Sequence, residues 1–542
     1  MTDLLTTLAG ALGDKPALID DRPDGTLIQW TFAELEANAN RLARVFLERG
    51  IQPKDKVMWC GHNSAWTVTC GHAARKVGAV SVPLNYRLTR EEATYVTDNS
   101  DARIVFIDAE HAELFESIRN GIPRVEHVIV YDGAPRPGQL AAAELLDAAS
   151  TDTVDVAADP AAAGTMIYTS GTTGKPKGAV RSNVGDPNQV QAMLAVYGCR
   201  PDDVYLTTGP LYHSGPGGYL AICQSQGNTA ILQRAFDAED WLRLVDKYGV
   251  TTTFSAPTPI RRICQLPDEV LAKYRRDSMR IMVANAAPWS YALKLAYLER
   301  FPEDSLFEVY GSTELGVNTI LTPEFQRAKR NSCGRPAPGV QIRLYAEDGH
   351  VVDKPREPGE LFVRSASVFT TYHKAEDKFR EDNRDGWQTV GDIAYFDEDG
   401  FYYICDRKKD MIISGGVNIY PAEIEDALEH HEDVMDVAVF GIPSEEWGES
   451  VHAVVVKRPG SALDAPTLQA FAREHLAGYK VPRSVDFVAE IPKTGSGKIL
   501  KRDLRATYWQ GHDSQVGWSA GTGSKSTKGP VPAAGPSAPK DR

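Results

Sequence analysis

Two patterns of hydrophobic and polar residues, one typical of amphipathic helices and one typical of buried strands, alternate over the first 160 residues. Thr31-Phe32-Ala33-Glu34 is a capping box that predicts the start of an amphipathic helix ending near Gly50. Short apolar runs separated by helical stretches follow, and they predict strands at 57–61, 77–85, 104–108 and 127–133. Helices that alternate with buried strands indicate an α/β fold with a largely parallel sheet, and similar units continue to about Tyr310.

The pattern changes near Arg335. Short strands broken by the turn signals AEDGH and DEDGF predict a small antiparallel or barrel-like unit. A further α+β unit is expected from about Asp410, with a helix that carries Pro421 in its first turn. Its strands are predicted at 435–443 and 452–459, and a second helix at 468–476. The stretch after Gly511 is mostly Gly, Ser, Pro, Ala and Lys, which predicts disorder.

Composition narrows the class of protein. A chain of 542 residues exceeds what one core easily packs, so two or three structural units are expected. The net charge of −14 argues against a general affinity for nucleic acid or anionic lipid. No basic residues precede the short apolar run at the N-terminus, so the run does not match a signal peptide. No apolar run reaches membrane-spanning length. The seven cysteines are scattered without a C-x-x-C pair, which favours reduced thiols in the cytoplasm over disulfides or a zinc site.

One segment, YTSGTTGKPKG at 168–178, has the composition of a phosphate-binding loop. Its glycines begin where a predicted strand ends, so backbone N–H groups, hydroxyls and ammonium groups surround one small volume. The Walker pattern does not fit, because Thr169 stands where its first Gly should be and Pro176 follows Lys175. The alternative is an ordinary surface linker.

Two further segments carry groups suited to a nucleotide. YGSTE at 310–314 offers an aromatic face, a hydroxyl and a carboxylate, which could stack a purine and hold Mg²⁺, although a tyrosine at a strand end is often only packing. The hairpin around DEDG would pair Phe396 with Phe401, setting Asp392 opposite Cys405 and near Arg407. Such a carboxylate could accept both ribose hydroxyls, unless the two charges are simply a structural pair.

A last basic loop lies in PKTGSGKILKRDLR, near the C-terminus. Gly495-Ser496-Gly497 can present Lys498 on a flexible tip, although several neighbouring cations are equally consistent with a solvated turn.

Together and in this order, these segments resemble the adenylate-forming superfamily of acyl- and aryl-CoA synthetases, nonribosomal adenylation domains and firefly-type luciferases. The chain looks most like a bacterial-type fatty acyl- or aryl-CoA ligase. The resemblance covers about residues 10–508 and rests on YTSGTTGKPKG, YGSTE, TVGD, DRKKDMIISGGVNIYPAEIE and PKTGSGKILKRDLR matching jointly.

The resemblance implies a fold and a two-step reaction. A large multi-layer α/β domain, 1–408, would contain a small β-barrel subdomain at about 331–408. It would be hinged at Lys409 to a small α+β domain, 409–508, and the tail 509–542 would be disordered. A carboxylic acid would attack the α-phosphorus of ATP, giving acyl-AMP and pyrophosphate. The C-terminal domain would then rotate, and the thiol of CoA would take the acyl group and release AMP.

The resemblance also assigns residues to these steps. Lys498 would bridge carboxylate and α-phosphate, Glu314 would hold Mg²⁺, and His213 would lie beside the acyl carboxylate. ATP would be bound by Thr169, Ser170, Gly171, Thr172, Thr173, Gly174, Lys175, Tyr310, Gly311, Ser312, Thr313, Asp392 and Arg407. The pantetheine of CoA would pass Gly415, Gly416 and Trp447, and its phosphates could meet Lys480 and Arg483.

Two segments depart from the family pattern. Asn285 and Trp289 stand in a segment that is usually rich in Gly and that should line the adenine and acyl pocket. Val417 stands where a polar, often acidic, residue is common. Neither change removes a catalytic group.

The acid and the acceptor are less defined than the chemistry. A fatty, aryl or steroid side-chain acid would fit, and the residues Tyr212, Gly215, Gly217 and Gly218 around His213 suggest room beside the carboxylate. A stand-alone enzyme that loads a carrier protein, a luciferase-like oxygenase and a catalytically silent nucleotide-binding regulator are the alternatives. Either a monomer or a homodimer is compatible with the sequence.

Overall fold

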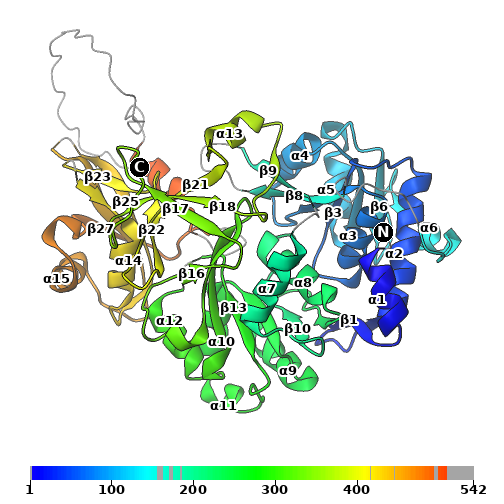
Figure 1. The fold of residues 1–542 in the computed structure, drawn as a ribbon, viewed down its shortest axis with the longest axis horizontal. Coiled ribbons are helices and arrows are strands. Elements are labelled where there is room, and N and C mark those ends of the chain that lie inside the picture. The colour runs from blue at the N-terminus through cyan, green and yellow to red at the C-terminus, as the bar shows by residue number, and fades with distance from the viewer. Residues whose placement is uncertain are drawn as a thin grey trace, which may run out of the picture.

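The computed structural model describes residues 3–154, 163–169, 175–182, 186–287, 289–415, 417–444, 446–493 and 499–509, and the structural statements below concern these residues. Of the predicted disordered tail, 509–542, only Trp509 belongs to them. In Figure 1 the N-terminal lobe and a second lobe, coloured green, lie next to each other. The C-terminal unit lies at the end of the molecule away from the N-terminal lobe.

An eight-stranded sheet forms the N-terminal lobe, in the order β19-β9-β8-β4-β3-β5-β6-β7. The four strands predicted from apolar runs are present, and they pair in parallel. The strands are β3 Lys56–Cys60, β4 Val80–Leu84, β5 Ala102–Asp108, β6 His127–Tyr131, β7 Leu140–Ala141, β8 Gly164–Thr169, β9 Lys177–Ser182 and β19 Thr371–His373. The accompanying helices are α1 Leu4–Leu12, α2 Phe32–Glu48, α3 Ala65–Lys76, α4 Arg90–Asn99, α5 Ala112–Ser117 and α6 Ala142–Ala148. The predicted capping box is confirmed at the start of α2.

A nine-stranded sheet forms the second lobe, in the order β16-β15-β14-β13-β12-β10-β11-β1-β2. Its strands are β1 Pro16–Asp21, β2 Leu27–Thr31, β10 Val204–Thr207, β11 Thr229–Ile231, β12 Thr252–Ser255, β13 Ile281–Ala284, β14 Leu306–Ser312, β15 Gly316–Leu321 and β16 Arg335–Pro336. Its helices are α7 Pro187–Tyr197, α8 Ser214–Ser225, α9 Ala238–Tyr248, α10 Pro257–Cys264, α11 Asp268–Leu271 and α12 Tyr291–Leu298. One hydrophobic cluster joins Phe106 of the first sheet to Phe254 of the second, so the two lobes share a core.

The predicted antiparallel unit is a five-stranded sheet. It contains β17 Gln341–Tyr345, β18 Gly359–Arg364, β20 Asn383–Arg384, β21 Trp387–Phe396 and β22 Tyr402–Arg407, with α13 Glu376–Glu381 nearby. The predicted register of its hairpin is wrong: Phe396 pairs with Tyr402, and Asp392 lies directly opposite Arg407. The turn is one residue longer than predicted because Asp397 accepts the Phe401 N–H, and a bulge follows between Ile393 and Ala394.

The C-terminal unit is a small α+β domain with a hydrophobic cluster of its own, which includes Ile412, Val439 and Leu468. Its five strands are β23 Ile412–Ser414, β24 Val417–Ile419, β25 Val434–Ser444, β26 Gly448–Lys457 and β27 Ser484–Phe487. Its helices are α14 Pro421–Glu429, α15 Ala465–His475 and α16 Lys501–Tyr508. The predicted Pro421 start of the first helix is confirmed.

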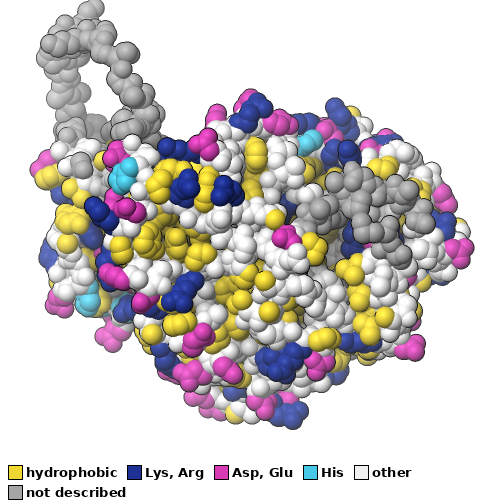
Figure 2. Space-filling model, viewed as in Figure 1, with side chains coloured by type: hydrophobic (Ala, Val, Ile, Leu, Met, Phe, Trp, Pro, Cys, Tyr) yellow, Lys and Arg dark blue, Asp and Glu magenta, His cyan; other side chains and the backbone are white. Residues whose placement is uncertain are grey.

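Acidic and basic side chains are interspersed over the face that Figure 2 shows. The net charge of −14 is therefore not gathered into one large patch there.

A partly buried polar network joins the N-terminus to α8. Asp3 caps α1 and accepts a hydrogen bond from Arg75 Nε at 2.9 Å. Arg75 also donates to Nδ1 of His72 at 3.0 Å, so the neutral imidazole carries its proton on Nε2 and donates it to Gln224 at 3.2 Å. Burial, together with the nearby Arg75 cation, lowers the pKa of His72 to about 3. Lys76 is the other cation beside this ring.

His72 should make stability depend on pH. The unfolded chain protonates this imidazole below about pH 6.5, whereas the folded chain does not until about pH 3. The free energy of unfolding should therefore fall on acidification through this range, by about 2 kcal/mol between pH 6.5 and pH 5. In urea unfolding, His72→Gln should show a flatter pH dependence than the parent. Identical slopes for the two proteins would contradict this role.

Candidate active site

A cavity of about 1680 Å³ lies where the carboxyl ends of strands from both large sheets meet the five-stranded sheet and the C-terminal domain. Thr169 at the end of β8, Val283 in β13 and Val309 in β14 line it from the large domain. Ile413 and Lys493 line it from the C-terminal domain. Ligands of open α/β sheets bind at such strand ends, which makes this cavity the candidate active site.

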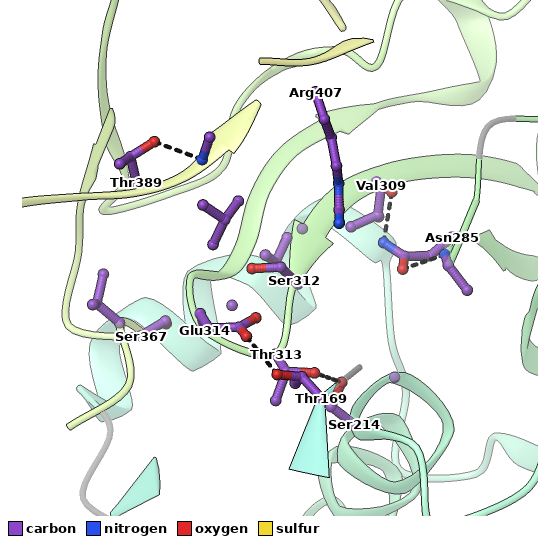
Figure 3. A pocket seen from close by; sticks show the side chains of 18 of the residues that line it. Thr169, Ser214, Asn285, Val309, Ser312, Thr313, Glu314, Ser367, Thr389 and Arg407 are labelled. Atoms are coloured by element: carbon purple, nitrogen blue, oxygen red, sulfur yellow. Dashed lines mark hydrogen bonds between the residues drawn. The ribbon is translucent and has the colours of Figure 1, made fainter. Parts of the chain in front are cut away.

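Glu314 lines the cavity and is held by two hydroxyl groups, of which Figure 3 labels that of Thr169. Its Oε1 accepts hydrogen bonds from Thr169 at 3.0 Å and from Tyr372 at 3.1 Å. Burial and the Glu314 carboxylate raise the pKa of Tyr372, so that the phenol remains a hydrogen-bond donor. The carboxylate is thereby fixed beside the end of β8, where the glycine-rich segment begins.

The loop that carries Glu314 is tied to both neighbouring elements. Thr313 Oγ1 lies 2.7 Å from Ser214 Oγ at the start of α8. Arg181, in β9, donates to the carbonyl oxygens of Thr313 and Ser367, each at 2.6 Å. The predicted positions Gly311 and Ser312 line the cavity at the end of β14, immediately before this loop. These supporting contacts could not be predicted from the sequence, because they join segments far apart in the chain and belong to no local motif.

Asp392 and Arg407 meet as predicted, with Arg407 Nε 3.3 Å from Asp392 Oδ1. Tyr310 adds a contact that the sequence did not suggest, donating its hydroxyl to Asp392 Oδ2 at 2.6 Å. Burial and the Asp392 carboxylate raise the pKa of Tyr310, which keeps the phenol a donor. Burial opposes the charge on Arg407, but Asp392 and Asp410 outweigh it and raise the pKa of Arg407. Each carboxylate oxygen of Asp392 retains a lone pair for another donor.

His213 lines the cavity immediately before α8, with its ring 4.4 Å from that of Tyr212. Two of the nearby glycines do not provide the expected room. A Cβ on Gly215 would lie 2.4 Å from the ring of Phe254, and one on Gly217 would lie 2.6 Å from a backbone oxygen of Leu211. These two glycines allow close packing instead. Gly218 does face open space, with no atom within 4 Å of its Cβ position.

Of the predicted CoA-side residues, Gly415, Trp447 and Arg483 lie together on the C-terminal domain. Gly415 has φ of +57°, and a Cβ there would approach the ring of Trp447 to 2.7 Å. Arg483 lies over the same ring, 4.4 Å from its centre. Lys480 forms an ion pair with Glu423 at 2.6 Å. The indole is thus placed between a glycine backbone and a guanidinium group.

Part of the predicted site lies outside the described residues. These positions are Ser170, Gly171, Thr172, Thr173, Gly174, Gly416 and Lys498. The residues that flank them are described. Lys175 lies over the ring of Tyr95 at 4.7 Å, and Lys493 pairs with Ile499 across the segment that contains Lys498.

Comparison with known proteins agrees with this geometry. The family model for AMP-binding enzymes matches residues 6–373, and the model of the AMP-binding enzyme C-terminal domain matches residues 423–498. The chain belongs to the AMP-binding enzyme family. It is therefore an adenylate-forming ligase with the large α/β domain and small C-terminal domain of that superfamily.

Relatives of this AMP-binding enzyme include CoA ligases and a carrier-protein ligase. The feruloyl-CoA synthase of Amycolatopsis sp. is 35% identical over 489 residues, which cover 90% of this chain and 95% of that protein. The fatty acid–[acyl-carrier-protein] ligase ScoC of Streptomyces coeruleorubidus is 32% identical over 491 residues, covering 88% and 92%. The crystal structure of the anthranilate CoA ligase AuaEII with anthranoyl-AMP superposes with a TM-score of 0.84 at 26% identity, covering 93% and 96%.

Among the described helices, none is both long and apolar enough to cross a membrane.

Proposed function

We propose that this enzyme is an AMP-forming acyl-CoA synthetase. It activates a carboxylic acid as acyl-AMP, releasing pyrophosphate, and then transfers the acyl group to CoA, releasing AMP. The observation that carries this proposal is the convergence of Thr169, Glu314 and Arg407 on one cavity in a chain of this family. Arg407 pairs with Asp392, which also accepts a hydrogen bond from Tyr310.

ATP is proposed to bind in this cavity. The segment from Thr169 to Lys175 holds the phosphates, Tyr310 with Gly311, Ser312 and Thr313 borders the adenine, and Asp392 and Arg407 hold the ribose. The Asp392 carboxylate fits a ribose because both of its oxygens retain acceptor capacity.

Glu314 would hold Mg²⁺ together with phosphate oxygens. The fit rests on a buried carboxylate that two hydroxyls orient, since magnesium in nucleotide sites is commonly bound by one or two carboxylates plus phosphates. The ion would supply positive charge between the phosphates.

The first step joins two anions and needs a cation between them. A carboxylate oxygen forms a bond to the α-phosphorus as the bond to pyrophosphate breaks. Lys498 is proposed to neutralise both groups as this charge develops. His213, which lines the cavity next to Ser214, is proposed to border the carboxylate.

The second step is proposed to use CoA, which approaches along Gly415, Gly416 and Trp447. Its thiol sulfur attacks the acyl carbon, the thiol proton is lost to solvent, and AMP leaves. We place the boundaries at 1–408, with the barrel-like part at about 331–408, and at 409–508, with the hinge at Lys409. Lys408 donates its N–H to Gly391 of the large domain at 2.8 Å, whereas the Lys409 carbonyl accepts from Arg505 of the C-terminal domain at 3.3 Å. The backbone of Lys408 is thus bonded to the large domain and that of Lys409 to the C-terminal domain, which supports a boundary between these two residues.

A product assay tests the proposed function. Purified protein with ATP, Mg²⁺, CoA and a panel of carboxylic acids should form AMP, pyrophosphate and thioester in equal amounts. Formation of ADP and orthophosphate would refute the mechanism. The enzyme could instead form acyl-AMP but give thioester only when an acyl carrier protein replaces CoA. That result would favour a carrier protein as the acceptor, as in the name of ScoC.

A further inference from the structure

Asn63 lies in the short segment between β3 and α3, and only 6% of it is exposed. The backbone that follows it is fixed, because Ser64 accepts the Thr67 N–H in the capping box that begins α3. The Asn63 side chain leaves the N-terminal lobe and reaches the second lobe. Its partners there are 146 to 170 residues away in the sequence, so no local pattern predicts the contact.

The side-chain amide of Asn63 matches three backbone groups of the second lobe. Its Nδ2 donates to the carbonyl oxygens of Gly209 and Gln233, each at 3.1 Å, and its Oδ1 accepts from the Leu211 N–H at 2.8 Å. The opposite orientation of the amide would set Oδ1 against two carbonyl oxygens, so these partners fix the side chain. Aspartate has the same shape but supplies no donor when it is ionised.

The segment that Asn63 holds leads directly to His213. Gly209 and Leu211 stand four and two residues before it, and the Pro210 carbonyl accepts from the His213 N–H at 3.2 Å. The His213 carbonyl then accepts the first hydrogen bond of α8. The backbone of His213 is thus placed by this turn, and Asn63 bonds to both residues that flank Pro210.

A ring contact supports the same turn from the N-terminal lobe. Tyr86, which follows β4, packs edge-on against Tyr212, with ring centres 5.5 Å apart. The ring of Tyr212 in turn lies 4.4 Å from that of His213. Leu211 and Tyr212 are buried, so bulk water is poorly placed to replace a hydrogen bond that the turn loses.

We propose that Asn63 is a positioning residue for the first half-reaction: it holds the turn 209–213 so that His213 meets the carboxylate of the acid. This inference rests on the proposed function, in which His213 borders that carboxylate. Asn63 is not among the described residues that line the cavity, so it acts through the turn. Its described hydrogen bonds reach none of the residues proposed to bind ATP, so ATP binding should not depend on it.

Asn63→Ala tests the inference in the full-length enzyme, with ATP, Mg²⁺ and the acid of the panel that the parent activates fastest. The kcat/KM for that acid, followed as pyrophosphate release, should fall about a hundredfold, which is the usual cost of a displacement of about 1 Å near the reacting groups. The affinity for ATP, measured by calorimetry without the acid, should stay at the parent value. A general loosening of the fold would weaken both.

A double-mutant cycle with His213→Ala shows whether Asn63 acts through the histidine. If it does, Asn63→Ala should cause little further loss of kcat/KM once His213 is already alanine, whereas independent effects would multiply. Asn63→Asp repeats the cycle in case the alanine variant folds poorly. It keeps the volume of the side chain and the acceptor for the Leu211 N–H, and it lacks the amide donors.

Asn40→Ala is the matched control for the loss of a buried asparagine. Asn40 is 1% exposed and also joins distant segments: it donates to the Thr151 carbonyl at 3.1 Å and accepts from the Val154 N–H at 3.4 Å. Asn40 is not among the described residues that line the cavity. This variant should lower the free energy of unfolding and leave the kcat/KM for the acid at the parent value.

The outcomes are distinct. Three results would overturn the inference and leave the proposed function standing: no loss in Asn63→Ala, an equal loss of ATP affinity and of kcat/KM for the acid, or the same fold-change in the His213→Ala background as in the parent. A parent that releases pyrophosphate with no acid in the panel would overturn the proposed function, and the inference with it.

Discussion

Replacing Lys498 with alanine is expected to lower the rate of acyl-adenylate formation by about 10²–10³, the usual effect of removing one well-placed group that stabilises developing charge. The carboxylate and the α-phosphate are both anionic, so a cation is needed most while the new bond forms. Thioester formation from acyl-adenylate supplied to the enzyme should be largely retained, because that step no longer brings the two anions together. Pyrophosphate release and thioester formation, each followed separately by rapid quench, measure the two steps.

Arg502→Ala is the matched control for the loss of charge. It removes an exposed cation from the same basic segment, and its described hydrogen bond and ion pair are with the neighbouring Asp503. Both half-reactions should proceed at the parent rate in this variant. An equal loss of both steps in Lys498→Ala would show that the lysine supports the domain and not adenylation.

The sequence predicted elements better than it predicted their register. Apolar runs such as 104–108 and the capping box at Thr31 are local signals, and each produced the element expected. The hairpin register failed because Asp397 lengthens the turn and a bulge lies beyond it. Bulges leave little trace in a hydrophobic pattern, since they shift pairing without changing which residues are apolar.

The site shows the same division between local and long-range information. Glu314 and Asp392 stand in recognisable motifs; Glu314 lines the cavity, and Asp392 pairs with Arg407, which lines it. Arg181 and Tyr372 position the Glu314 loop, yet they act across long sequence separations from segments without a motif. Gly215 illustrates a different failure: glycine permits both empty space and close approach, and only the position of Phe254 decides between them.

Lys409→Pro is expected to retain acyl-adenylate formation and to lose thioester formation, which is the opposite of the result expected for Lys498→Ala. One active site must serve two reactions of different geometry, and the proposed rotation changes backbone dihedrals at or beside Lys409. Proline fixes φ near −65° and restricts the residue before it, so Lys408 and Lys409 would both lose freedom. Among the described hydrogen bonds none uses the Lys409 N–H, so the substitution breaks no described backbone contact.

The arrangement that forms acyl-adenylate should survive in this variant, because bound ATP stabilises it. Acyl-AMP should therefore form and stay bound, while the rate of thioester appearance falls by orders of magnitude. Lys409→Ala removes the same ammonium group but keeps the backbone free, and it should retain both steps if the hinge acts through its dihedrals. Rapid-quench measurement of acyl-AMP and thioester in the two variants decides the matter. Thioester formation at the parent rate in Lys409→Pro would mean that rotation at this residue does not serve the second step.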